Sequence, residues 1–144
     1  MLIEYFGSVK NKPVVDVFVV NCIKKLKLER LRVPVISISF VSRLDCYGLC
    51  SGSPKRVEIE ISKHCPTTGR KLGFMEMMHT LGHELIHARQ IIRRELTTDG
   101  EGFRWKSRRA NGYRYENQPW ELEAYRQEDD VLMKCFPWNM NFNN

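Results

Sequence analysis

The pentapeptide His83-Glu84-Leu85-Ile86-His87 constrains this chain more than any other segment. It lies within residues 74–95, where apolar residues recur at the spacing of an amphipathic helix. On such a helix His83 and His87 project from the same face, about 6 Å apart along the axis. The two imidazoles can therefore reach one common point beside the helix, and Glu84 lies next to it.

Two helical imidazoles at this separation can bind one tetrahedral zinc ion, and a glutamate after the first histidine can accept a proton from water at the metal. The plainer interpretation of the pentapeptide is two surface histidines flanking a solvated carboxylate. We expect the metal site, with His83 and His87 as ligands and Glu84 as the catalytic base.

A third protein ligand has few candidates. The chain has four histidines, and none follows His87. His79 lies about 12 Å from His87 along the helix axis, so the three cannot share one ion, and we expect His79 to pack in or near the core. The remaining choices are a carboxylate or a thiolate. Glu121 and Glu123 lie on a predicted helix over residues 119–133 and point to different sides of it, so at most one can face the metal.

Three segments together carry a family resemblance: LGHELIHARQ, GFRWK and YRYENQPWELEAYRQE. They resemble the zincin metallopeptidases of the gluzincin type, and most of all small phage and bacterial proteins that read HELxHxxQ and then PWExEAY. In the related HtpX-type and ImmA-type peptidases the ligand is the glutamate three residues before an alanine, which implies Glu121. Those families often have Asp or Asn after the alanine, whereas this chain has Tyr125. A carboxylate behind the ligands is then missing, and Glu123 stays an alternative ligand.

The resemblance implies a zinc-dependent metallopeptidase in which His83, His87 and Glu121 hold Zn²⁺ and Glu84 is the general base for peptide hydrolysis. The strand predicted over residues 55–63 is expected to bind an extended peptide by edge pairing, as the corresponding strand does in zincins. Tyr113 and Tyr115 are candidates for stabilising the oxyanion, although aromatic packing is the plainer role for both. The alternatives are a nucleic-acid-associated protein with a structural, non-catalytic zinc, or an SprT-like DNA-linked protease.

A second feature is a basic segment over residues 89–114. Phe103, Trp105 and Tyr113 are interleaved with its basic residues, and the chain as a whole carries a net charge of +6. Basic and aromatic residues together are typical of a nucleic-acid contact, but also of an ordinary solvated loop. Nucleic acid is therefore a possible partner. The basic residues are Arg89, Arg93, Arg94, Arg104, Lys106, Arg108, Arg109 and Arg114.

The remaining pattern predicts an α+β fold: one zincin-like minidomain over residues 1–144, with a small antiparallel sheet between the N-terminal helix and the HExxH helix. The predicted elements are a helix over 14–32, strands over 33–41 and 55–63, a turn over 45–53, a loop over 64–73, the helix over 74–95, a long basic loop over 95–118, and a C-terminal ligand helix from Pro119.

Composition also bears on location. No apolar run reaches the length of about 20 residues that a membrane helix needs, and no signal peptide is recognisable. The five cysteines are an odd number, which argues against a disulfide scaffold. We expect a cytoplasmic protein, in the host cytoplasm if it is phage-encoded. Cys46 and Cys50 with His64 and Cys65 could form a small metal knot, but free thiols are the plainer expectation.

Overall fold

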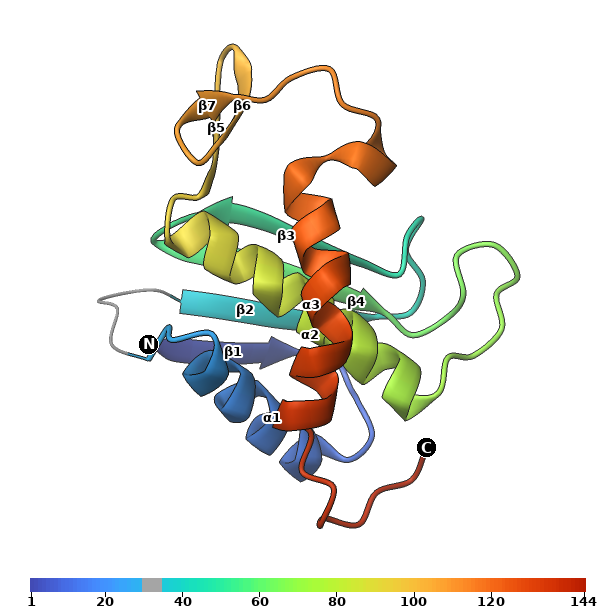
Figure 1. Cartoon of the computed structure of the whole chain (residues 1–144). Coiled ribbons are helices and arrows are strands. Elements are labelled where there is room, and N and C mark those ends of the chain that lie inside the picture. The colour runs from blue at the N-terminus through green and yellow to red at the C-terminus, as the bar shows by residue number, and fades with distance from the viewer. Residues whose placement is uncertain (30–34) are drawn as a thin grey trace.

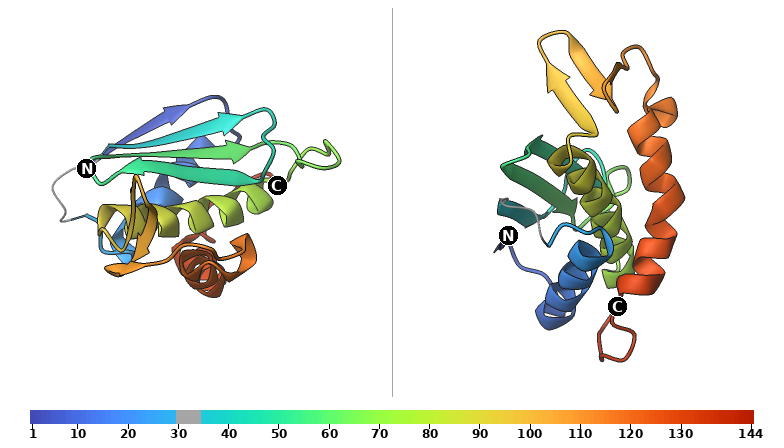
Figure 2. Two further views of the ribbon diagram at one scale, coloured as in Figure 1. Left: turned by 90° about the horizontal axis from the view of Figure 1, so that it is seen from above. Right: turned by 60° about the vertical axis from the view of Figure 1, so that its left-hand side comes forward.

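The computed structural model describes residues 1–29 and 35–144, which form a small α+β domain, as predicted. Helices α1 and α2 lie on one face of a mixed sheet, and α3 packs on the side of α2 away from the sheet (Figure 1, Figure 2). A second, small sheet lies apart from the first, beyond the ends of two helices. The elements are β1 (Leu2–Phe6), α1 (Lys12–Lys25), β2 (Val35–Val41), β3 (Gly48–Ser53), β4 (Arg56–Ser62), α2 (Phe74–Ile92), β5 (Leu96–Asp99), β6 (Gly102–Trp105), β7 (Arg108–Arg109), the 3-10 helix η1 (Tyr115–Asn117) and α3 (Pro119–Cys135).

The main sheet has the order β1-β2-β4-β3. β1 and β2, and likewise β2 and β4, are parallel, whereas β3 is antiparallel to β4. The alternation along β4 matches its predicted two faces, because Val57, Ile59 and Ile61 are fully buried. These side chains belong to the core that the sheet forms with α1 and α2.

The predicted antiparallel sheet is wrong in its pairing. The strands over 33–41 and 55–63 run parallel, because the chain between them returns as β3 along the outer edge of β4. The predicted turn over 45–53 is also wrong, since Gly48–Ser53 pairs with β4 along its whole length. β1, for which no strand was predicted, adds a further parallel strand at the other edge.

The helices begin close to where they were predicted, but two of them end earlier. α1 ends at Lys25 rather than at residue 32: Lys27 adopts the left-handed conformation (φ 58°), and the N–H of Leu28 bonds the carbonyl of Ile23. α2 stops at Ile92, and Arg94 is again left-handed (φ 59°). The remainder of the first predicted helix and the start of the first predicted strand, residues 30–34, lie outside the described residues.

The prediction of a long loop over 95–118 is also wrong. It contains the three-stranded β5-β6-β7 sheet and η1. The side chain of Asn111 closes this small sheet, accepting a hydrogen bond from the N–H of Phe103 and donating one to the carbonyl of Glu101, both at 2.8 Å. The Phe103 ring lies 5.0 Å from the ring of Trp120 on α3, which anchors the small sheet to the domain.

α2 is the central helix, between the sheet and α3 (Figure 2). Every residue from 81 to 88 is buried, so this stretch has no solvated face. Three of its buried residues are polar or charged: His83, Glu84 and His87. Such groups are unfavourable in a core unless they find partners there. The partners they find define the candidate site.

Candidate metal centre

Three buried side chains from two helices meet at one point: His83 and His87 from α2, and Glu121 from the first turn of α3. His83 Nε2 lies 3.1 Å from Glu121 Oε1, and His87 Nε2 lies 3.0 Å from Glu121 Oε2. The two Nε2 atoms are 3.1 Å apart. Ligands bound to zinc at about 2.0–2.1 Å in a tetrahedron lie about 3.3 Å from one another, so the cluster has nearly the size of such a set.

The outer nitrogens of both imidazoles are occupied. His83 Nδ1 donates to Glu128 Oε2 at 2.7 Å, because a carboxylate can only accept. His87 Nδ1 donates to the amide oxygen of Gln90, also at 2.7 Å. The Gln90 amide nitrogen donates to the carbonyl of Trp120 (3.1 Å) and to Glu123 (3.1 Å), which fixes the amide with its oxygen toward His87.

These outer hydrogen bonds decide the chemistry of the centre. With Nδ1 protonated, a neutral imidazole presents an unprotonated Nε2. The lone pairs of His83 and His87 then face each other and the Glu121 carboxylate, an arrangement that is repulsive unless a positive charge lies between them. Buried histidines held by outer acceptors in this way are typical of zinc ligands. The donor set of two imidazoles and one carboxylate therefore fits Zn²⁺.

The pKa values of His83, His87 and Glu121 also indicate that positive charge is stabilised at this point. Burial by itself lowers the pKa of His83 and of His87, but their hydrogen bonds, above all those to Glu121, and the negative charges of Glu121 and Glu84 outweigh burial, so both pKa values are raised. Burial by itself raises the pKa of Glu121, but the two histidines hold it at about 2. Without a cation the cluster takes up protons, and a dication would displace them.

Glu84 lies beside this cluster, buried between α2 and the edge strand β3. A Cβ on Gly48 of β3 would come within 3.2 Å of Glu84 Cγ and Oε1, and within 2.7 Å of Thr80 Cγ2. The glycine therefore lets the strand approach the helix. Burial raises the pKa of Glu84, although His87 and His83 oppose the shift. A carboxylate whose pKa is raised toward neutrality is suited to proton transfer.

A cavity of about 620 Å³ gives access to this side of the cluster. His83 and Glu84 line it together with Gly48, Tyr115, Tyr125 and Glu128. Its volume is in the range of small-ligand and peptide side-chain sites. The cavity brings a ligand to the face of the cluster that Glu84 occupies.

The structure brings some of the predicted site residues to the cluster and leaves others outside it. Glu121 is in the cluster, whereas Glu123 lies outside it and accepts a hydrogen bond of 2.6 Å from Arg89 Nη2. Tyr115 donates to Glu121 Oε1 at 3.1 Å, so it reaches the centre, while Tyr113 is half exposed. The prediction that His79 packs in or near the core is wrong: its side chain is 39% exposed, and Nε2 lies 2.8 Å from Asp129 Oδ1 at the surface.

A second group that could hold a cation consists of His79, Glu128 and Asp129, at the surface one helical turn from His83. Neither this group nor the buried cluster, the two found among residues 1–29 and 35–144, contains a cysteine. The cysteines are free thiols, as expected, including the Cys46 and Cys50 pair.

The sequence did not predict Glu128 and Gln90 as the hydrogen-bond partners of the two Nδ1 atoms. The structure has the carboxylate that seemed to be missing after Ala124, but it comes from Glu128, one turn later on α3. Gln90 was visible in the motif HELxHxxQ, three residues after His87 and on the same helical face, and it had been given no role.

No family model matches the chain, and a search of curated proteins finds no significant match. No helix in the described residues has the length and apolar character to cross a membrane.

Proposed function

We propose that this chain is a zinc-dependent metallopeptidase of zincin-like fold, with His83, His87 and Glu121 as the zinc ligands and Glu84 as the general base. The observation that carries the proposal is the buried cluster itself, in which every outer hydrogen bond directs a lone pair inward. Three protein ligands leave one position for water or substrate, the coordination that is typical of catalytic rather than structural zinc.

Each side chain has a role in the proposed reaction. Bound zinc would supply Lewis acidity that activates water and polarises a carbonyl. Glu84 accepts a proton from the attacking water and delivers it to the leaving amine, and its raised pKa makes it a stronger base for the first transfer. Glu128 and Gln90 orient the two imidazoles. Tyr115 is close enough to the cluster to donate a hydrogen bond to a developing oxyanion.

The substrate strand assigned from the sequence needs a correction. The strand over 55–63 is β4, which is flanked by β2 and β3 and has no free edge. Its neighbour β3 is an edge strand, and Gly48 of β3 lies against Glu84. An extended peptide that pairs with β3 would run alongside the catalytic carboxylate, which supports a peptide as the substrate class.

The basic segment gives less support to the nucleic-acid alternatives. Several of its side chains pair with carboxylates: Arg109 with Asp99 at 3.0 Å, and Arg89 with Glu123 at 2.6 Å. Phe103 packs on Trp120. A structural zinc, moreover, has no use for a buried carboxylate such as Glu84 beside an accessible cavity. A peptidase linked to DNA would keep the proposed chemistry and differ only in its partner.

The test compares the parent protein with Glu84→Gln and Glu58→Gln variants of the full chain, each loaded with zinc and analysed for metal content. Glu58 is an exposed glutamate on β4 and serves as the matched control. The probes are fluorescein-labelled denatured casein and a random peptide library. We expect all three proteins to bind one zinc, and Glu84→Gln alone to lose about 10²–10⁴-fold in hydrolysis. Equal hydrolysis by parent and Glu84→Gln at equal zinc content would refute the mechanism, and zinc without hydrolysis of either probe by the parent would favour a structural role.

A further inference from the structure

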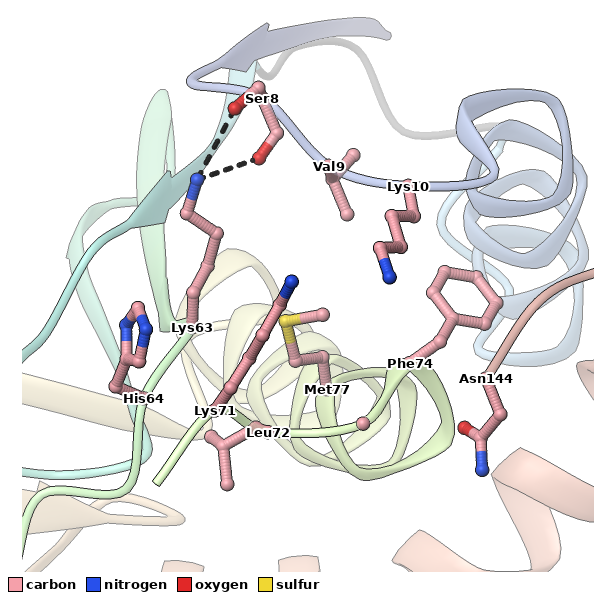
Figure 3. Close-up of a pocket in the computed structure, with 11 residues that line it drawn as sticks. Ser8, Val9, Lys10, Lys63, His64, Lys71, Leu72, Phe74, Met77 and Asn144 are labelled. Carbon is pink, nitrogen blue, oxygen red and sulfur yellow. Dashed lines mark hydrogen bonds between the residues drawn. The ribbon is translucent and has the colours of Figure 1, made fainter. Parts of the chain in front are cut away.

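A second cavity, of about 640 Å³, lies at the start of α2 and shares no lining residue with the cavity beside Glu84. It is formed where the loop after β1, the connection between β4 and α2 and the C-terminal residue Asn144 meet at the first turn of α2 (Figure 3). Its volume is within the range of small-molecule sites, about 300–1,000 Å³.

The cavity combines an apolar wall with a cationic rim. Val9, Leu72, Phe74 and Met77 supply the wall. Lys10 comes from the loop after β1, whereas Lys63 and Lys71 come from the two ends of the connection between β4 and α2, and Figure 3 shows their ammonium groups around the same opening. None of the residues that line it in the described part of the chain is an aspartate or a glutamate.

Two of the three ammonium groups are available to a ligand. Lys63 Nζ donates to the carbonyl of Ser8 at 3.1 Å and to its hydroxyl at 3.3 Å. Lys10 and Lys71 are exposed, and no ion pair found within residues 1–29 and 35–144 includes either of them. The first turn of α2 is already capped, since Glu76 accepts from the N–H of Gly73 at 3.0 Å. The lysines are therefore the source of positive charge at this opening.

We propose that this cavity binds a small phosphate monoester with an apolar or aromatic body, of the size of a nucleoside monophosphate. Two available lysines match the charge of a phosphate monoester, which is close to −2 at neutral pH, better than they match a single carboxylate. Lysine binds phosphate as a point charge through short, charge-assisted hydrogen bonds. The volume is far larger than inorganic phosphate needs, and the apolar wall gives the rest of the molecule a surface to contact.

Calorimetric titration of the full chain at about pH 7.5 tests this site, with AMP as the probe and adenosine and inorganic phosphate as its two halves. The variants are Lys10→Gln/Lys71→Gln and, as a control of equal charge, Lys24→Gln/Lys55→Gln, whose lysines are exposed elsewhere on the surface. We expect AMP to bind in the micromolar range, each half to bind at least about tenfold more weakly, and only the Lys10/Lys71 variant to lose at least about tenfold in affinity for AMP.

Three outcomes would overturn the proposal. The first is no saturable binding of AMP below about 1 mM. The second is equal loss in the two double variants, which would mean a general response to surface charge. The third is an affinity for adenosine or for inorganic phosphate equal to that for AMP, because the apolar wall or the lysines would then contribute nothing. If the Lys10/Lys71 variant fails to fold, the single variants Lys10→Gln and Lys71→Gln give the same comparison, with about threefold expected from each.

Discussion

The Nδ1–H group of His83 donates a 2.7 Å hydrogen bond to Glu128, which lies two helical turns after Glu121 on α3. One helix thus carries both a carboxylate for the inner nitrogens and a carboxylate for the outer nitrogen of the first histidine. The packing of α3 against α2 fixes both contacts together.

Replacing Glu128 should weaken zinc binding without abolishing it. In Glu128→Ala the His83 ring loses its outer acceptor, and the fixed tautomer and orientation go with it, so we expect about a 10–100-fold loss in zinc affinity. Competition with a chromophoric chelator measures this loss. Asp129→Asn is the control, because Asp129 contacts His79 and is not in the buried cluster. Unchanged affinity in Glu128→Ala would show that the His83–Glu128 hydrogen bond does not matter to the metal.

Glu121 and Glu123 offer a matched pair, two residues apart on one helix. Glu121→Gln should lose about 100-fold or more in zinc affinity, because a neutral amide oxygen replaces a charged ligand. Glu123→Gln should keep its zinc but lose about 1–3 kcal/mol in free energy of unfolding, because Arg89 and Gln90 lose a charged partner. Metal analysis and denaturant unfolding separate the two effects. The reverse pattern would make Glu123 the ligand.

Gly48 should tolerate no side chain. In Gly48→Ala the new Cβ would lie 2.7 Å from Thr80 Cγ2 and 3.2 Å from Glu84, so the strand or the carboxylate must move. We expect about 1–3 kcal/mol of destabilisation, with hydrolysis reduced and zinc content unchanged. Gly100→Ala is the control, since a Cβ there meets nothing within 4 Å. If the two variants unfold at the same denaturant concentration, the close approach of β3 to α2 is not as described.

Helical periodicity explains which parts of the site were predictable. Within one helix, spacing fixes direction, so His83, Glu84 and His87 could be placed from sequence. Glu121 needed the family resemblance in addition. The role of Glu128 was not predicted, because which α3 residue reaches the Nδ1 atom of His83 depends on the rotation of α3 against α2. No local sequence pattern encodes that rotation.

The sheet was less predictable for a similar reason. β4 alternates in sequence and was recognised, but whether it runs parallel to β2 depends on the path of the chain between them. β3 contains Gly48, Ser51, Gly52 and Ser53, a composition that is typical of turns. Gly48 instead allows β3 to lie close to Thr80 and Glu84, which are distant in sequence, and this contact becomes visible only in the folded molecule.

The proposed zinc ion would compete with protons for the buried cluster, and this predicts opposite pH dependences of stability with and without metal. The folded pKa values of His83 and His87 are raised, so in the metal-free protein their contribution to stability is fully present below the unfolded value of about 6.5 and is lost as pH rises through the folded values. The Glu121 carboxyl, whose folded pKa is about 2, contributes stability that is present above its unfolded pKa and is lost as pH falls through about 2.

Zinc requires unprotonated imidazoles, so the stabilisation it adds grows with pH. We expect a larger zinc-induced rise in Tm at about pH 8 than at about pH 5.5, measured by differential scanning calorimetry with free zinc held constant. His79→Gln should follow the parent, because His79 lies outside the buried cluster, whereas His87→Gln should show almost no rise at either pH. A zinc-induced rise that is equal at the two pH values, or larger at the lower one, would mean that the ion does not bind through these histidines.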